Sequence, residues 1–199
     1  MKEGKENEAR ALLALFKEFS VDYNANSLSK VLNMTSMGAL KILKRMEKGD
    51  IIIPRQMGKA VFYSIDFNND YARTYLKFAL QREAEQSSPR VKRWVEELRK
   101  FKGVADIGLL FGSVMTKQDF NDVDLLLVFE KARAGKVNSL LKDISDVSVK
   151  KIHLVRQTRT DIESNLKKKD KVLLSALKRG IVLFGYDELI EVVASVSRR

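Results

Sequence analysis

A short strand that begins with two aspartates most narrows what this chain can fold into. The segment Asp122-Val123-Asp124-Leu125-Leu126-Leu127-Val128 is apolar after its first three residues, as is typical of a strand buried on both faces. Side chains at positions i and i+2 of a strand point to the same face, so Asp122 and Asp124 should lie side by side. Two carboxylates that close repel each other unless a cation lies between them. The segment therefore predicts a divalent-metal site at the start of a buried strand.

A glycine–serine pair lies shortly before this strand. Gly112 and Ser113 follow a predicted strand over residues 104–111. Glycine lets the backbone approach a phosphate closely, and serine offers both its amide and its hydroxyl to the same phosphate. The alternative is a polar turn ahead of an ordinary buried strand, but the turn, the spacing and the strand agree with one another. We therefore predict that Gly112 and Ser113 bind a nucleotide and that Asp122 and Asp124 hold the metal.

Composition limits the metal and the partners. The chain has 199 residues, no cysteine and one histidine, which excludes thiolate and histidine-rich zinc sites and leaves Mg²⁺ or Mn²⁺ on carboxylates. The absence of cysteine fits a reducing cytoplasm, where we expect the protein. No apolar run is long enough to span a bilayer, so no membrane is expected among its partners. The net charge of +11 favours nucleic acid, nucleotides or an acidic protein, and a lysine-rich solvated surface is the alternative.

The clearest break in the chain is Gln86-Ser87-Ser88-Pro89, where proline and serines mark a turn or a helix start. We place a domain boundary here, with one domain over residues 1–86 and a second over residues 87–199. In the second domain, predicted strands alternate with helices, which favours an α/β arrangement. The expected fold class is α+β with two domains. The Trp94 and Leu98 face of the first helix after the break is expected in the core between the domains.

The second domain resembles the polymerase-beta-like nucleotidyltransferase superfamily in its minimal form. The segments Phe111-Gly112-Ser113 and Asp122-Val123-Asp124 match the family signature of Gly-Ser, a loop and Asp-x-Asp before an apolar strand. The resemblance covers most of residues 89–185 and implies a small fold with a mixed sheet. It also implies that Asp122 and Asp124 are catalytic and hold Mg²⁺ or Mn²⁺, with a nucleoside triphosphate as ligand or substrate. Members of the family transfer a nucleoside monophosphate to a hydroxyl.

The sequence departs from the family in the residues that support catalysis. The family places a third carboxylate on a later strand, where it helps to activate the attacking hydroxyl. The predicted strand over residues 149–155 has no acid, and Lys151 or His153 stands at the expected position. Asp146, Asp161 and Glu163 are the nearby acids that remain as substitutes. The loop over residues 114–121 is also short, without the Ala-Arg-Gly segment of many minimal members. These departures predict weak or absent nucleotidyl transfer.

The first domain resembles the winged helix-turn-helix class. Its predicted order is three helices, two short strands over residues 51–53 and 60–65, and a long helix over residues 69–85. Helical spacing places Val31 in the core and Tyr71 and Phe78 on the apolar side of the long helix. The helix from Ser36 to Lys48 would read the major groove and the hairpin would contact phosphates or the minor groove. The residues predicted to contact DNA are Ser36, Lys41, Lys44, Arg45, Arg55 and Lys59.

Several functions remain open from the sequence. The first interpretation is a DNA-binding transcriptional regulator whose nucleotidyltransferase domain binds metal and nucleotide but has lost catalysis. The alternative is an active Mg²⁺-dependent enzyme that transfers a nucleoside monophosphate to a protein or nucleic acid, and a remoter one is the antitoxin of a toxin–antitoxin pair. The order of domains resembles two-domain proteins found mainly in archaea. The winged helix could instead serve dimerisation or protein docking. If the partner is double-stranded DNA, a homodimer is expected as well, because operators are two-fold symmetric.

Overall fold

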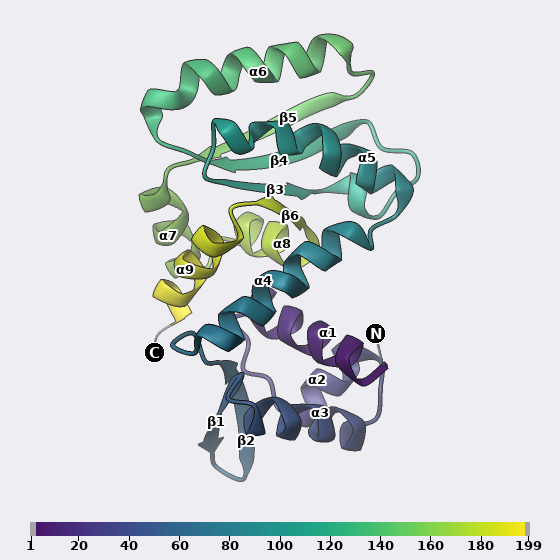
Figure 1. Cartoon of the computed structure of the whole chain (residues 1–199), viewed down its shortest axis with the longest axis vertical. Helices are drawn as coiled ribbons and strands as arrows, with labels where there is room; N and C mark the ends of the chain where they lie inside the picture. Colours follow the sequence, from purple (N-terminus) through teal and green to yellow (C-terminus); the bar gives the residue numbers. More distant parts are fainter. Residues whose placement is uncertain (1–2, 198–199) are drawn as a thin grey trace. The chain divides into compact units, whose positions relative to one another are not determined.

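The structure is a computed structural model, and it describes residues 3–197. The chain divides into two compact units, unit 1 over Met1–Ala79 and unit 2 over Leu80–Arg199 (Figure 1). Both helices and strands are present, and the larger sheet is mixed, which confirms the expected α+β class with a mixed sheet. Within residues 3–197, no helix is both long and apolar enough to cross a membrane.

Unit 1 is a group of helices followed by a two-stranded hairpin. Its elements, in chain order, are α1 (Glu3–Lys17), α2 (Ala25–Leu32), α3 (Ser36–Lys48), β1 (Ile52–Met57), β2 (Ala60–Ile65) and the first part of α4 (Asp70–Glu85). The strands pair antiparallel from Ile52 opposite Ile65 to Met57 opposite Ala60. The first strand is longer than predicted, so the turn at the tip of the hairpin contains only Gly58 and Lys59.

Capping side chains fix where α2 and α3 begin. Asn24 accepts a hydrogen bond from the Ser27 amide, and the Ser27 hydroxyl accepts one from the Asn24 amide, which makes a capping box. Asn24 therefore caps α2. The Thr35 side chain accepts from the Gly38 amide and begins α3 at Ser36, as predicted. Apolar residues at helical spacing hold α3 against unit 1: Ala39, Ile42, Leu43 and Met46.

Three apolar side chains lie at the surface instead of the predicted interior. Val31 is 46% exposed, Tyr71 62% and Phe78 45%. The buried stripe of α4 is one position further along the helix and includes Ala72, Leu76, Ala79 and Leu80. The predictions for Val31, Tyr71 and Phe78 were wrong because an apolar residue next to a helical stripe fits the same spacing as the stripe itself.

Unit 2 carries a four-stranded sheet with helices on both faces. Its elements after α4 are α5 (Pro89–Leu98), η1 (Arg99–Gly103), β3 (Ile107–Phe111), η2 (Ser113–Met115), β4 (Asp122–Val128), η3 (Lys131–Arg133), α6 (Ala134–Val147), β5 (Lys151–Gln157), α7 (Arg159–Lys167), α8 (Lys171–Arg179), β6 (Ile181–Phe184) and α9 (Tyr186–Ser197). The predicted domain boundary between residues 86 and 87 falls in the turn between α4 and α5.

The sheet has the order β5-β4-β3-β6. Strands β4 and β5 are parallel and are joined through α6, whereas β3 is antiparallel to both β4 and β6. The register places Asp122 opposite Lys151, Asp124 opposite His153, and Phe111 opposite Asp124. The two aspartates therefore stand at the start of a central strand, between the end of β3 and the start of β5.

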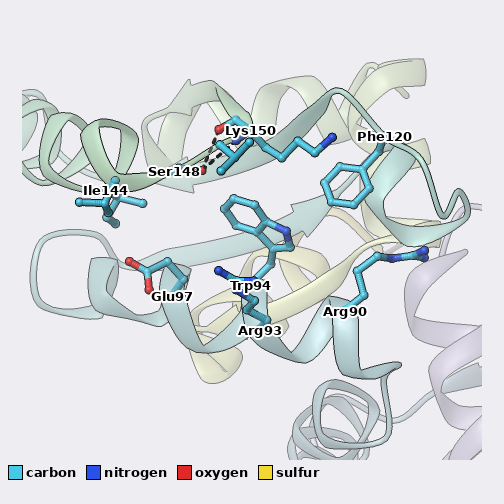
Figure 2. A pocket seen from close by; sticks show the side chains of 10 residues that line it. Arg90, Arg93, Trp94, Glu97, Phe120, Ile144, Ser148 and Lys150 are labelled. Atoms are coloured by element: carbon cyan, nitrogen blue, oxygen red, sulfur yellow. Dashed lines mark hydrogen bonds between the residues drawn. The ribbon is translucent and has the colours of Figure 1, made fainter.

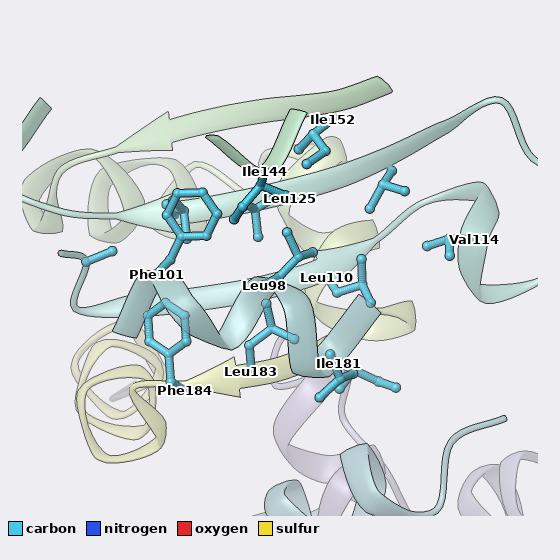
Figure 3. Packing of buried hydrophobic residues seen from close by; sticks show 14 of the residues in the cluster. Leu98, Phe101, Leu110, Val114, Leu125, Ile144, Ile152, Ile181, Leu183 and Phe184 are labelled. Atoms are coloured by element: carbon cyan, nitrogen blue, oxygen red, sulfur yellow. The ribbon is translucent and has the colours of Figure 1, made fainter. Parts of the chain in front are cut away.

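Alternate residues of the sheet build two cores. One face packs Leu110, Leu125 and Ile181 against Val95 and Leu98 of α5 and against α6 (Figure 3). The other face places Ile107, Leu109 and Leu126 around a small apolar space with residues of α7, α8 and α9, namely Ile162, Leu166, Leu173, Leu177 and Leu189. Asp122 and Asp124 are four and two residues before Leu126 on the same strand, so their side chains point to the same face of the sheet, the one covered by α7, α8 and α9. Leu98 lies fully buried within unit 2, so its predicted place between the domains was wrong.

Candidate functional site

Gly112 ends β3 in a backbone conformation that only glycine adopts readily. Its φ is 84° and its ψ is −154°, a region that costs other residues about 1–3 kcal/mol. A Cβ at this position would also overlap the Asp124 carboxylate. Glycine is therefore required here twice, once by the backbone and once by the close approach of Asp124. The turn and the carboxylate strand form one site.

The Asp122 and Asp124 carboxylates meet the imidazole of His153. His153 Nδ1 lies 3.3 Å from Asp122 Oδ2 and 3.7 Å from Asp124 Oδ1. All three side chains remain partly open to solvent, with exposed fractions of 36% for Asp122, 27% for Asp124 and 45% for His153. The two aspartates thus lie close together, as predicted, and the chain's one histidine contacts both of them.

Burial and a neighbouring charge make Asp124 hard to ionise. Partial burial raises the pKa of the Asp124 carboxyl, and the negative charge of Asp122 raises it further. The positive charge that His153 carries when protonated has a smaller, opposite effect on this pKa. The cluster therefore has unbalanced negative charge, and a cation at this point would relieve it.

Ser113 brings a second unsatisfied group to the site. Its hydroxyl oxygen is buried and has no hydrogen-bond partner among residues 3–197. A buried hydroxyl without a partner costs about 1–3 kcal/mol. The backbone of the turn is hydrogen-bonded: the Met115 amide donates to the Gly112 carbonyl, and the Lys117 amide donates to the Ser113 carbonyl. A ligand oxygen at this turn would satisfy the Ser113 hydroxyl.

Among residues 3–197, no third carboxylate completes the pair. Asp161 accepts hydrogen bonds from the amide and hydroxyl of Thr158, the N-cap of α7, and so completes a capping box; these bonds lower the pKa of Asp161. Glu163 pairs with Arg159 at 3.1 Å. Across residues 3–197, no group of three histidine, cysteine, aspartate or glutamate side chains is placed to hold a metal ion. Mg²⁺ is commonly held by one or two carboxylates with phosphate oxygens and waters as the other ligands, so the pair fits such an ion only together with a phosphate ligand.

The residues predicted to contact DNA on α3 lie on one exposed face. Lys41 and Lys44 are exposed, and Lys44 Nζ is 2.8 Å from Glu47 Oε2, a hydrogen bond that raises the pKa of Lys44. Ser36 is exposed and donates a hydrogen bond to the Asn26 side chain. Arg45 lies at the edge of this face.

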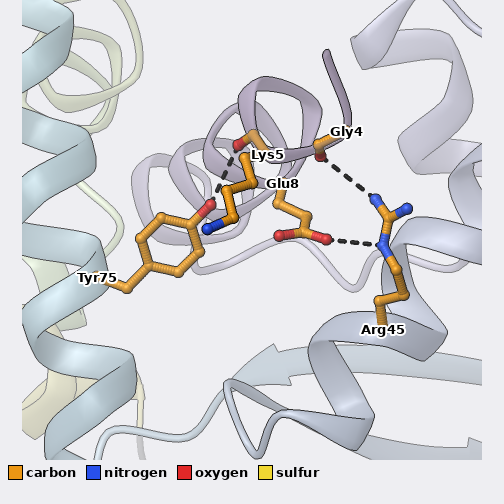
Figure 4. A network of polar contacts seen from close by, with 5 residues as sticks. All are labelled: Gly4, Lys5, Glu8, Arg45 and Tyr75. Carbon is orange, nitrogen blue, oxygen red and sulfur yellow. Dashed lines mark hydrogen bonds and ion pairs between the residues drawn. The ribbon is translucent and has the colours of Figure 1, made fainter. Parts of the chain in front are cut away.

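Arg45 is held by residues of α1. Its Nε is 2.7 Å from Glu8 Oε1, and its Nη2 donates to the Gly4 carbonyl oxygen (Figure 4). In the hairpin, Arg55 Nη2 is 2.7 Å from Asp22 Oδ1, whereas Lys59 is exposed at the tip. Among the basic residues predicted to contact DNA, Lys44, Arg45 and Arg55 are thus paired with acidic side chains, which leaves Lys41 and Lys59 the most available to DNA.

Sequence reasoning did not identify two residues that support the site. Arg90 of α5 donates a hydrogen bond to the carbonyl of Val114, the residue after Ser113. Phe120, from the loop between the two halves of the motif, is buried. Neither residue lies within a recognisable motif, and their roles depend on packing between segments that are distant in the sequence.

Comparisons of the chain with protein-family models, with curated proteins and with solved structures found no match.

Replacing Asp124 by asparagine should stabilise the metal-free protein at neutral pH. The raised pKa of Asp124 means that the folded state binds the proton more tightly than the unfolded state, whose carboxyl titrates near its ordinary value of 3.8. Unfolding free energy therefore falls as pH rises through the raised pKa. Asp124→Asn does not lose unfolding free energy in this way. It should therefore be more stable than the unmodified protein at neutral pH, and this difference should disappear below pH 3.8, the ordinary pKa of the aspartate carboxyl.

The measurement is urea unfolding of both proteins in EDTA across this pH range. Asp119→Asn removes the same charge from an exposed position in the preceding loop and should show no such pH-dependent advantage. A neutral-pH loss of stability in Asp124→Asn would contradict the electrostatic account and make the carboxylate structural.

Proposed function

We propose that this chain is a DNA-binding regulator that senses a nucleotide. Unit 1 acts as a winged helix that reads DNA through α3, and unit 2 acts as a nucleotidyltransferase fold that binds a metal–nucleotide complex without transferring it. The observation that carries the proposal is the placement of His153. It contacts both aspartates from the strand position where the resembling family carries its third carboxylate.

Nucleotide binding is supported by three properties of the Gly112–Ser113 turn and the start of β4 beside it. Gly112 lets the Asp124 carboxylate approach the turn, the Ser113 hydroxyl lacks a partner among residues 3–197, and the Asp122–Asp124 pair carries unbalanced negative charge. Asp122 and Asp124 would hold Mg²⁺ or Mn²⁺, and Gly112 and Ser113 would contact the phosphates. The metal would supply charge neutralisation between the carboxylates and the phosphates.

DNA binding is supported by the exposed face of α3 and by the hairpin beside it. The helix has a buried apolar stripe and an opposite face with Lys41 and Lys44, which suits insertion into a groove. Lys59 at the hairpin tip suits a phosphate contact. The net charge of +11 adds long-range attraction to a polyanion.

Enzyme activity is the second candidate, and the intact turn favours it. Gly112, Ser113 and both aspartates keep the residue types of the resembling family, so substrate could be positioned even without the third acid. Within residues 3–197, no further carboxylate is placed beside them to accept the proton of the attacking hydroxyl. General-base help of this kind contributes about a hundredfold to ten-thousandfold in rate. The regulator proposal therefore expects transfer to be undetectable or very slow.

The test is incubation with α-labelled nucleoside triphosphates, Mg²⁺ or Mn²⁺, and a mixture of transfer RNA and cell protein. We expect nucleotide binding without label transfer. His153→Asp places a carboxylate opposite Asp124 and should raise metal affinity and initiate slow transfer, whereas the control His153→Asn adds no acid and should do neither. Robust transfer by the unmodified protein that is lost in Asp122→Asn would establish the enzyme instead.

A further inference from the structure

A second cavity lies on the opposite face of the sheet from the two aspartates. It has a volume of about 470 Å³ and is lined by α5, the β3–β4 loop, the end of α6 and the loop before β5 (Figure 2). Small-molecule sites in proteins measure about 300–1,000 Å³. This cavity is therefore large enough for a ligand of nucleotide size, and all of its lining belongs to unit 2.

Aromatic and aliphatic side chains form the body of the cavity. Trp94 presents its ring to the cavity between α5 and the segment that contains Ser148, and Phe120 lies at one end of the cavity (Figure 2). Val147 and Val149 line it as well, although 81% and 98% of their surfaces are exposed. An indole beside uncovered valines offers a flat apolar surface for a planar ring.

The charged groups of the cavity are mainly cationic. Arg90 and Lys150 both approach the Phe120 ring, at 5.9 Å and 5.1 Å from its centroid, so two positive charges lie near one another. Arg93 adds a third cation. The one acid in the lining, Glu97, is paired with Lys100 at 2.6 Å, which offsets its charge. The surplus of cations favours an anionic occupant.

Arg90 also has unused hydrogen-bonding capacity. Its Nε is buried and has no hydrogen-bond partner in the described part of the chain, residues 3–197, while its Nη2 donates to the Val114 carbonyl. The same side chain therefore touches the cavity and the turn that follows Ser113.

We propose that this cavity binds a planar aromatic anion, with the ring against Trp94 and the negative group near Arg93 and Lys150. This site is independent of the proposed metal–nucleotide site, because it needs neither aspartate nor a metal ion. The ligand is either a mononucleotide or an aromatic carboxylate, since both combine a flat ring with a negative group. Binding through Arg90 would reach the Gly112–Ser113 turn from behind the sheet.

Trp94 is the chain's one tryptophan, so its fluorescence reports on this cavity directly. The full-length protein in EDTA is titrated with adenosine monophosphate and with 1-naphthoate. Adenosine, which has the aromatic ring but no negative charge, and inorganic phosphate, which has the charge but no ring, serve as controls. We expect saturable changes with the two aromatic anions and at least about tenfold weaker binding of adenosine and phosphate. Tighter binding of the nucleotide or of the naphthoate identifies the source of the natural ligand.

Matched variants locate the binding. Val149→Glu puts a negative charge at the exposed mouth and should weaken binding at least about tenfold, whereas Val172→Glu, at an exposed valine of α8 outside the lining, should not. Arg93→Gln should weaken binding, whereas Lys92→Gln, which removes the same charge from the next residue, should not. Asp124→Asn should leave the titration unchanged, which separates this site from the metal–nucleotide site.

Two results would overturn the proposal. One is the absence of any saturable Trp94 response to either aromatic anion. The other is binding that Val149→Glu and Arg93→Gln weaken no more than their controls do, or that inorganic phosphate matches in affinity.

Discussion

Gly112→Ala should destabilise the protein strongly and abolish its binding of nucleotide. The alanine must adopt a φ of 84° with a ψ of −154°, and its Cβ must displace the Asp124 carboxylate. The backbone term alone costs about 1–3 kcal/mol, and moving a partly buried carboxylate adds to it. A total of about 3 kcal/mol corresponds to a fall of roughly 6–12 °C in the melting temperature of a chain of this size. Nucleotide binding should disappear because the displaced carboxylate no longer faces the turn.

Gly58→Ala is the matched control. Gly58 has a φ of 59° at the tip of the hairpin, but a Cβ there would meet no atom within 4 Å. Its substitution should therefore cost only the left-handed backbone strain of about 1 kcal/mol and leave nucleotide binding intact. Thermal unfolding gives the stability of both variants, and calorimetric titration with ATP and Mg²⁺ gives their binding. Equal losses of stability in the two variants would show that Asp124 does not crowd Gly112.

Replacing Lys41 and Lys44 together by alanine should remove most DNA affinity. Each lysine that contacts a phosphate contributes about one unit to the slope of log affinity against log salt concentration, so the double variant should lower that slope by about 2. Lys41→Ala should have the larger single effect, because Glu47 already holds Lys44. For the same reason Lys59→Ala should weaken binding more than Arg55→Ala, since Asp22 holds Arg55.

The measurement is gel retardation of genomic fragments over a range of salt concentrations. Lys92→Ala with Lys142→Ala removes the same charge from exposed positions of unit 2 and should change the slope little. Absence of retardation at low salt would refute DNA binding. Retardation that all four variants of unit 1 leave unaffected would move the nucleic-acid surface to the lysines at residues 167–171.

Local signals predicted the parts of the fold that depend on local chemistry. The start of α3 at Ser36 follows from the Thr35 cap, and the pairing of Asp122 with Asp124 follows from strand alternation. The strand over residues 60–65 was also predicted with the bounds that β2 has.

Features that depend on distant pairing were harder to predict. The sequence left Lys151 and His153 as equal candidates beside the aspartates, and the register of β5 with β4 decides which one contacts both carboxylates. Register depends on which faces of both strands are buried and on the connection between the strands, and the residues around Lys151 and His153 alone do not show these. The cavity beside Trp94 likewise arises where three separate segments meet.

Calorimetric titration of ATP into the unmodified protein, with Mg²⁺ and then with EDTA, tests the central claim most directly. The account predicts saturable binding that requires the metal, falls at least about a hundredfold in Asp122→Asn, and persists in Asp119→Asn, which removes the same charge from the exposed loop before the strand. Because occupation of the cavity beside Trp94 requires no metal, its contribution is the binding that remains in EDTA. Metal-dependent binding that survives in Asp122→Asn, or its absence in the unmodified protein, would contradict the account.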